Sequence, residues 1–296
     1  MQTILVPIDF SPAAENALLY ANKLAGRLPA ELVLLHAGTG APLPPDERAA
    51  RLRRLAALAE RLRYQQLPRQ DGRRLRYHYH VAADLLPDCL PTLAAGYRAD
   101  LVVTGLALHN CAAPAPGQVA DYLPERVSCP VLVVPPGRHE LPTRLAVAGE
   151  LPRLSGPQLA ALPALASTPS AALDVVQVYR PAPEPGAASR QLTELRQALR
   201  TVQQHLPHAA THLLPDEDAL EAISEFCDRQ ATQLLVLGTA DGCLLRRLYH
   251  PHYRQTHAYH LRIPVLLLPL AQRPSAACCA RCALRQMATG HLAPAP

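Results

Sequence analysis

Two clusters of side chains near the carboxyl end of the sequence have the residue types used in metal or thiol chemistry. Four histidines lie between residues 250 and 260, and imidazole nitrogens are good ligands for zinc, copper and nickel. Cysteines follow at Cys278, Cys279 and Cys282, and the last two form a Cys-x-x-Cys pair. Such pairs occur in structural zinc sites, which need four ligands, and in redox proteins. One hypothesis is therefore a metal- or thiol-responsive protein.

Both clusters also have simpler interpretations. His250 and His252 flank a proline, so they cannot share one face of a helix, and no carboxylate is interleaved with the histidines. A basic surface for an anion or a partner therefore competes with a metal site. The cysteine cluster offers too few local ligands for zinc, and it lies in a segment with the composition of a loose tail. The remaining cysteines lack paired spacing, so we interpret them as free thiols.

A third candidate is Asp9, which follows the apolar run at 3–8. It stands directly before Ser11 and Pro12, a pair typical of the first residues of a helix. A carboxylate at this position could contact a ligand. It could equally stabilise the N-terminus of the helix, whose dipole favours negative charge by about 0.3–1 kcal/mol. One residue can do both.

The elements that must position these residues alternate between strand and helix. In the first half we expect strands at 3–9, 31–36, 74–81, 100–105 and 130–135, and helices at 13–28, 46–66 and 85–97. In the second half we expect strands at 144–149, 172–179, 210–214, 233–238 and 263–269, and helices at 158–166, 190–205 and 218–230. This alternation predicts an α/β fold with mostly parallel strands and helices on both faces. The strands are apolar throughout, as a doubly covered sheet requires.

The two halves repeat one pattern. The sequence LVVTG at 101–105 corresponds to LLVLG at 234–238, and PVLVVP at 130–135 corresponds to PVLLLP at 264–269. Two matched segments in matched order indicate a tandem repeat. Ligands of such sheets bind at the carboxyl ends of the strands, beside the point where the strand order reverses. That rule directs attention to Asp9, to the residues after His36 and to the loop after Gly105.

The first half resembles the universal stress protein family. The resemblance rests on ILVPIDFS at 4–11, LLH at 34–36, DLVVTG at 100–105 and CPVLVV at 129–134, which occur in the family's order and spacing. The second half repeats the plan more weakly, so the chain looks like a tandem universal stress protein. The resemblance implies two Rossmann-like, five-stranded domains at 1–137 and 142–271, the second degenerate, with a cysteine-containing tail at 272–296. It also implies a pseudo-dimer in which the strands at 130–134 and 264–268 pair within one chain.

Some members of this family bind ATP or AMP, and the resemblance assigns a candidate nucleotide site to this chain. The base and ribose would contact Pro7, Ile8, Asp9, Ala37 and Thr104, and the phosphates would lie against Gly105, Gly117 and Gln118. The family's binders carry further glycines and a final Ser or Thr in the loop after the fourth strand, because glycine lets backbone amides approach phosphate. Leu108, Gln118 and Val119 stand at those positions here. The resemblance therefore implies at most weak AMP or ATP binding in the first half.

The second half departs further from the family's nucleotide site. Glu150 replaces the aspartate that follows the first strand, and the loop that begins at Gly238 lacks a closing Gly-Ser. A nucleotide-free protein-interaction scaffold is therefore the main alternative function, beside the metal- or thiol-responsive hypothesis. We expect the chain to be non-catalytic, because it contains none of the common nucleophile, phosphate-loop, zinc-protease or dinucleotide motifs.

Composition supports an ordinary globular protein. The 296 residues are 49 % hydrophobic and 18 % charged, with a formal net charge of +5. The arginines are dispersed, so no nucleic-acid partner is expected, and no apolar stretch approaches a membrane span. The start of the sequence lacks a secretory leader, which favours a cytoplasmic location. The expected role is stress-response binding or regulation, with an unidentified protein partner. Association of two chains into a homodimer is a further alternative.

Overall fold

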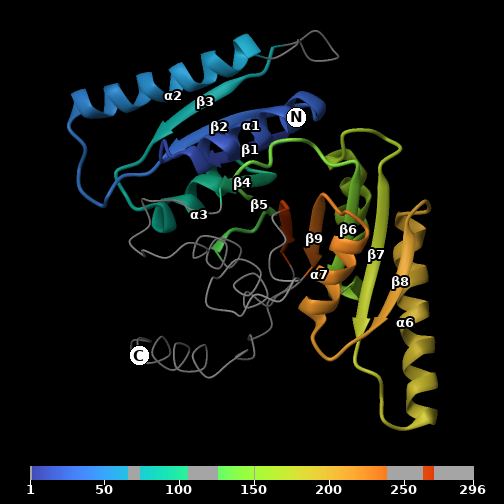
Figure 1. Ribbon diagram of the computed structural model, residues 1–296. Helices are drawn as coiled ribbons and strands as arrows, with labels where there is room; N and C mark the ends of the chain where they lie inside the picture. Colours follow the sequence, from blue (N-terminus) through green and yellow to red (C-terminus); the bar gives the residue numbers. More distant parts are fainter. Residues whose placement is uncertain (1, 66–73, 106–125, 150, 239–262, 270–296) are drawn as a thin grey trace, which may run out of the picture.

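The computed structural model describes residues 2–65, 74–105, 126–149, 151–238 and 263–269. The described strands form one ten-stranded sheet in the order β3-β2-β1-β4-β5-β10-β9-β6-β7-β8. The first five are β1 (Gln2–Pro7), β2 (Ala30–His36), β3 (Tyr77–Val81), β4 (Leu101–Gly105) and β5 (Val131–Val134). The second five are β6 (Arg144–Gly149), β7 (Ala172–Tyr179), β8 (Ala210–Pro215), β9 (Leu234–Gly238) and β10 (Val265–Leu268). Each half therefore has the same strand order, counted inwards from its own edge of the sheet to the strand at the centre (Figure 1).

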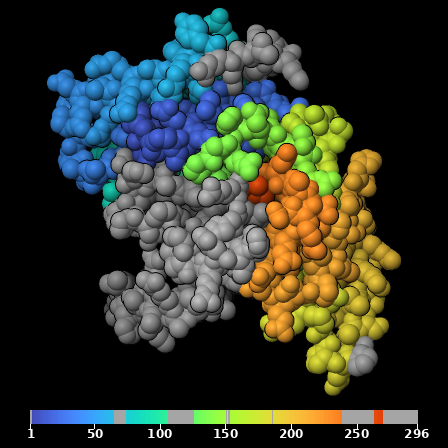
Figure 2. All heavy atoms as spheres, in the orientation of Figure 1, coloured from blue at the N-terminus to red at the C-terminus, as the bar shows by residue number. Residues whose placement is uncertain are grey.

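The two halves meet at β5 and β10. These strands pair antiparallel, with Val265 opposite Val133 and Leu266 opposite Leu132, while all the other neighbouring pairs are parallel. Figure 2 shows the blue amino-terminal lobe and the orange and yellow carboxyl-terminal lobe meeting at the green and red segments. The predicted pairing of the last strands, and with it the pseudo-dimer, is confirmed.

The helices of the first half are α1 (Pro12–Arg27), α2 (Pro45–Gln65) and α3 (Leu86–Gly96). Arg61 of α2 forms an ion pair with Glu15 of α1 at 2.5 Å, so these two helices lie on the same face of the sheet. The chain returns from β3 to β4 through α3, and a right-handed connection places α3 on the opposite face. The predicted covering of both faces is therefore present.

The second half carries α5 (Gly156–Ala161), α6 (Pro185–His205) and α7 (Ala219–Arg229), with 3₁₀ turns η1 (Leu151–Arg153) and η2 (Leu162–Leu165). The helix expected at 158–166 is thus wrong in its second part, because the chain tightens into η2 there. Pro163 lies in this turn, and proline removes the backbone N–H that a continuing α-helix would need.

The core is formed by the inner strands. β1, β4 and β5 are almost fully buried, as expected for strands covered on both faces. The expectation of strands that are apolar throughout is wrong at β8, which is partly exposed because it is an edge of the sheet. β3 forms the other edge and is also partly exposed, and its sequence alternates between polar and apolar residues. The expectation is also wrong at β7, where Asp174 is buried and its Oδ1 lies 2.9 Å from Nε2 of His212. Within the described residues, no helix is both long and apolar enough to cross a membrane.

Candidate functional site

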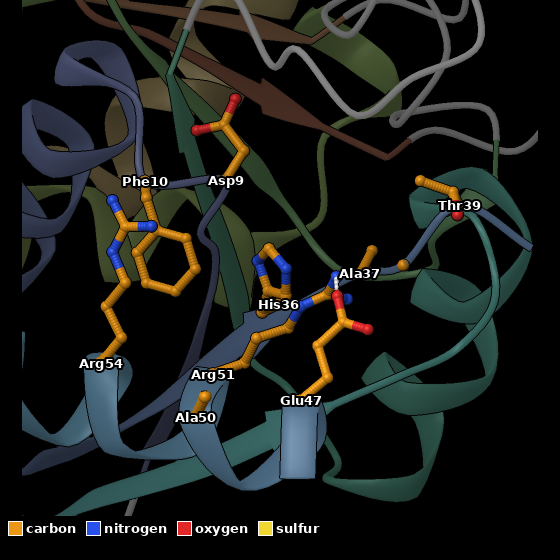
Figure 3. Close-up of a pocket in the computed structure, with 10 residues that line it drawn as sticks. Asp9, Phe10, His36, Ala37, Thr39, Glu47, Ala50, Arg51 and Arg54 are labelled. Carbon is orange, nitrogen blue, oxygen red and sulfur yellow. Dashed lines mark hydrogen bonds and ion pairs between the residues drawn. The ribbon is translucent and has the colours of Figure 1, made fainter. Parts of the chain in front are cut away.

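A cavity of about 410 Å³ opens at the carboxyl ends of β1 and β2 (Figure 3). Three segments form its wall: the loop after β1, the last residue of β2 with the loop that follows, and the first turns of α2. The lining residues are Asp9, Phe10, His36, Ala37, Gly38, Thr39, Glu47, Ala50, Arg51 and Arg54. The cavity therefore lies at the end of the sheet where ligands of open α/β folds bind.

Asp9 and Phe10 form the turn between β1 and α1. Oδ1 of Asp9 accepts a hydrogen bond from the Ser11 N–H at 2.9 Å. Ser11 in turn caps α1, because its hydroxyl oxygen accepts from the Ala14 N–H at 3.2 Å. Phe10 has a φ of 62°, a left-handed conformation that is strained for a bulky residue. The helix-stabilising interpretation of Asp9 is thus correct, and the carboxylate also lines the cavity.

The Phe10 ring packs against the His36 imidazole, with 4.8 Å between the ring centroids. Nδ1 of His36 lies 2.7 Å from the Ile8 carbonyl oxygen, so the ring donates from Nδ1. Burial lowers the pKa of His36, and the positive charges of Arg51 and Arg54 lower it as well, against the opposing effects of the Ile8 hydrogen bond and Asp9. The lowered pKa favours a neutral ring, whose Nε2 is then a hydrogen-bond acceptor.

The wall contributed by α2 is charged. The Arg54 guanidinium lies over the Phe10 ring, 4.0 Å from its centroid, a contact that cation–π attraction favours. One turn earlier, Arg51 forms an ion pair with Glu47 (Figure 3). Both arginines lie on the helix face that looks towards the ends of β1 and β2.

The floor of the cavity consists of small residues. The N–H of Gly38 donates to the Asp84 carbonyl at 3.0 Å, and the N–H of Gly40 donates to the Ala83 carbonyl at 3.0 Å. A Cβ on Gly38 would lie 2.2 Å from the Ala83 carbonyl oxygen, so only glycine fits this approach. Because these residues have short side chains, they leave the volume of the cavity unfilled.

The structure brings together only part of the predicted site. Asp9 and Ala37 line the cavity. Pro7 ends β1, Ile8 is 2 % exposed, and Thr104 is fully buried with its hydroxyl donating to the Gly105 carbonyl at 3.3 Å. None of these three, nor Gly105, lines the cavity.

Gly105 has a packing role instead. A Cβ there would lie 2.7 Å from the Ala13 carbonyl oxygen, so glycine allows β4 to end against the start of α1. Gly117 and Gln118, the remaining predicted phosphate contacts, lie outside the described residues.

Sequence analysis missed the contributions of Phe10, His36, Glu47, Arg51 and Arg54 to the site. A signal for them was present, because the spacing of Glu47, Arg51 and Arg54 places all three on one face of a helix. That face could have been assigned to the site from the order β2–loop–α2. The helix that follows a strand begins near the carboxyl end of that strand, so its first turns lie beside the ligand-binding end of the sheet.

The residues of the metal and thiol hypothesis lie outside the described residues, and so do Glu150 and the loop after Gly238. Within the described ranges, no group of three or more His, Cys, Asp or Glu side chains could hold a metal ion. Cys89, Cys129 and Cys227 are free, as expected. Burial raises the pKa of Cys89 and Cys129 to about 11 and that of Cys227 to about 12. These thiols are therefore poor nucleophiles at neutral pH.

Comparison with known proteins agrees with this architecture. The chain is similar to the crystal structure of a universal stress protein from Archaeoglobus fulgidus, with 14 % identity, a TM-score of 0.56, and 91 % of this chain and 96 % of that chain covered. It is also similar to a putative universal stress protein from Pseudomonas aeruginosa, with 17 % identity, a TM-score of 0.54 and coverage of 90 % and 93 %. At these identities the likeness establishes the fold.

No curated protein sequence matches the chain. Residues 1–135 match the universal stress protein family, and this range contains all five strands of the first half and the whole lining of the cavity. The match to the universal stress protein family therefore covers the first lobe of the chain and, with it, the candidate site.

Proposed function

We propose that the first half binds an adenine nucleotide weakly in the cavity beside β1 and β2, and that the chain acts as a non-catalytic module of a stress response. The observation that carries the proposal is the cavity itself. It lies in the family-matched half, at the ligand-binding end of the sheet, with an aromatic pair and a carboxylate in its wall. Its volume of about 410 Å³ lies within the range of small-molecule sites.

The lining offers suitable chemistry for a nucleoside. His36 presents a flat, polarisable ring that Phe10 holds in place, and such rings favour contact with a planar base. The Asp9 carboxylate can accept hydrogen bonds from an exocyclic amine or from ribose hydroxyls. Neutral His36 adds an acceptor at Nε2. A purine nucleoside carries donors that match these acceptors.

The proposed affinity is weak because the site is only partly assembled. Thr104 and Ile8, both expected to contact the ligand, are buried away from the cavity. Asp9 already uses one oxygen for the Ser11 N–H. The same observations favour a second candidate function, in which the fold serves as a nucleotide-free scaffold for a protein partner.

One experiment separates the two functions. The purified full chain is heat-denatured to release any bound nucleotide, and its melting temperature is measured with and without AMP. A ligand at about 100 times its Kd adds about 2.7 kcal/mol, which raises the Tm of a domain of this size by several degrees. Released nucleotide or a Tm increase supports the proposal. If no nucleotide is released and millimolar AMP does not raise the Tm, the proposal is refuted and the scaffold function is favoured.

A variant connects the effect to this cavity. Asp9→Asn keeps an oxygen that accepts from the Ser11 N–H, so the turn before α1 is preserved while the negative charge is lost. We expect AMP to bind about tenfold more weakly, which corresponds to about 1.4 kcal/mol. Asp46→Asn removes one charge from an exposed residue at the start of α2 that does not line the cavity, and it is the matched control.

A further inference from the structure

The groups in the cavity that could bind a phosphate are arginine side chains, whereas the sequence analysis looked for a glycine-rich loop. Two arginines of α2, Arg51 and Arg54, line the cavity one turn apart, opposite the end of β1. Their guanidinium groups can donate to the oxygens of a phosphate in a planar, forked geometry. The helix therefore supplies the groups that a phosphate needs.

Four backbone amides beside the cavity already have hydrogen-bond acceptors within the protein. The N–H groups of Gly38 and Gly40 donate to the carbonyls of Asp84 and Ala83. At the start of α1, the Ser11 N–H donates to Asp9 and the Ala14 N–H donates to Ser11. These four amides are therefore not available to an anion, whereas the arginine side chains of α2 face the cavity.

The two arginines are not equivalent. Arg51 already has a carboxylate partner in Glu47. Arg54 makes its contact with the Phe10 ring and forms no ion pair within the described residues. The contact of Arg54 with the ring uses no carboxylate, so its N–H donors can pair with an anion. The positive charge of both residues also reaches the end of β2, where it disfavours protonation of His36.

We propose that Arg54, assisted by Arg51, holds the phosphate of the nucleotide, so that the cavity selects a phosphorylated nucleotide over the free nucleoside. This inference rests on the proposed function and adds the orientation of the ligand. The base lies towards Phe10, His36 and Asp9, and the phosphate lies along α2. Glu47 competes with the phosphate for Arg51 and weakens the binding of the anion.

Isothermal titration calorimetry of the full chain with adenosine and with AMP tests the inference. We expect AMP to bind at least about tenfold more tightly than adenosine, the value of one good charge-assisted contact. Arg54→Gln should remove most of this preference, and Arg51→Gln should remove less of it. Adenosine affinity is measured in each variant as well, and a loss of affinity shared equally by adenosine and AMP would overturn the assignment of Arg54 to the phosphate.

Two further variants make the test specific. Arg53→Gln removes a positive charge from the same helix at an exposed position that does not line the cavity, and it should leave the preference unchanged. Glu47→Gln frees Arg51, so it should strengthen AMP binding about threefold relative to adenosine binding. A gain of affinity is not expected from a merely structural role.

The possible outcomes are distinguishable. Equal affinities for adenosine and AMP, or a preference for AMP that survives Arg54→Gln, would overturn the inference and leave the proposed function standing. Binding of neither ligand would overturn both. An equal loss of AMP affinity in Arg53→Gln and Arg54→Gln would also overturn the inference, because it would indicate a general effect of helix charge.

Discussion

Substituting alanine for two glycines of the first half should change stability in opposite directions. Gly38 lies in the floor of the cavity, and a Cβ there would be 2.2 Å from the Ala83 carbonyl oxygen. Gly26 lies near the end of α1, and a Cβ there would meet nothing within 4 Å. The chemical change is identical, so the difference between the two variants reports only the surroundings.

The expected magnitudes follow from these contacts. The Gly38→Ala overlap is with backbone, so the loop must move away from Ala83 and Asp84. That movement strains or breaks the hydrogen bonds from Gly38 and Gly40, both 3.0 Å long. At about 0.5–1.5 kcal/mol for each bond, the loss is about 1–3 kcal/mol. Gly26→Ala should instead stabilise the protein by about 0.5–1 kcal/mol, because alanine is the better helix former and restricts the unfolded chain.

Urea denaturation followed by circular dichroism at 222 nm measures both free energies of unfolding. The wild-type chain and Gly96→Ala serve as controls, since a Cβ at Gly96, the last residue of α3, also meets nothing within 4 Å. A Gly38→Ala variant within about 0.5 kcal/mol of wild type would refute the close approach of the two loops, and with it the shape of the cavity floor.

Two other predictions concern the joint between the halves and the aromatic pair. The Leu266 side chain is 2 % exposed and lies in β10, which pairs with β5. Leu266→Ala should lower the free energy of unfolding by about 3 kcal/mol in the same urea assay. A loss below about 1 kcal/mol would contradict a buried interface between the halves. The pKa of His36 is lowered in the fold, so the unfolded chain binds the proton more readily, and stability should be complete above about pH 6.5 and fall below it. Between pH 8 and pH 5.5, the free energy of unfolding should fall less for His36→Asn than for the wild-type chain. An equal fall in the two proteins would exclude this histidine as a source of the pH dependence.

Much of the fold could be predicted from the sequence because its signals are local. Apolar runs of strand length, the Ser11-Pro12 helix start and the matched pairs of late strands are each visible within a few residues. Together they predicted the α/β class and the repeat, both of which the structure contains. The pairing of β5 with β10, which the structure also contains, was predicted on other grounds. The strand pairing followed from the family resemblance, because nothing in a single strand specifies a partner from the other half of the chain.

The sequence was less informative at the edges of the sheet and about the site. Whether a strand is covered on both faces depends on its neighbours, so the partial exposure of β3 and β8 could not be predicted from composition alone. Predicted contacts such as Thr104 were assigned from the family resemblance, but whether a residue at the end of a strand reaches a cavity depends on the elements packed around it. Thr104 is buried in β4, and Arg51 and Arg54 of α2 line the cavity instead.

By itself, therefore, the sequence determined the order of the elements, the repeat and the end of the sheet at which the cavity opens. The tertiary structure decided which side chains meet there. The pairing of β1 with β2 brings Phe10 and His36 together, and the packing of α2 against β2 and β3 adds the arginines. Local patterns specify what each segment becomes, whereas a site depends on distances between segments, and only the packed core sets those distances.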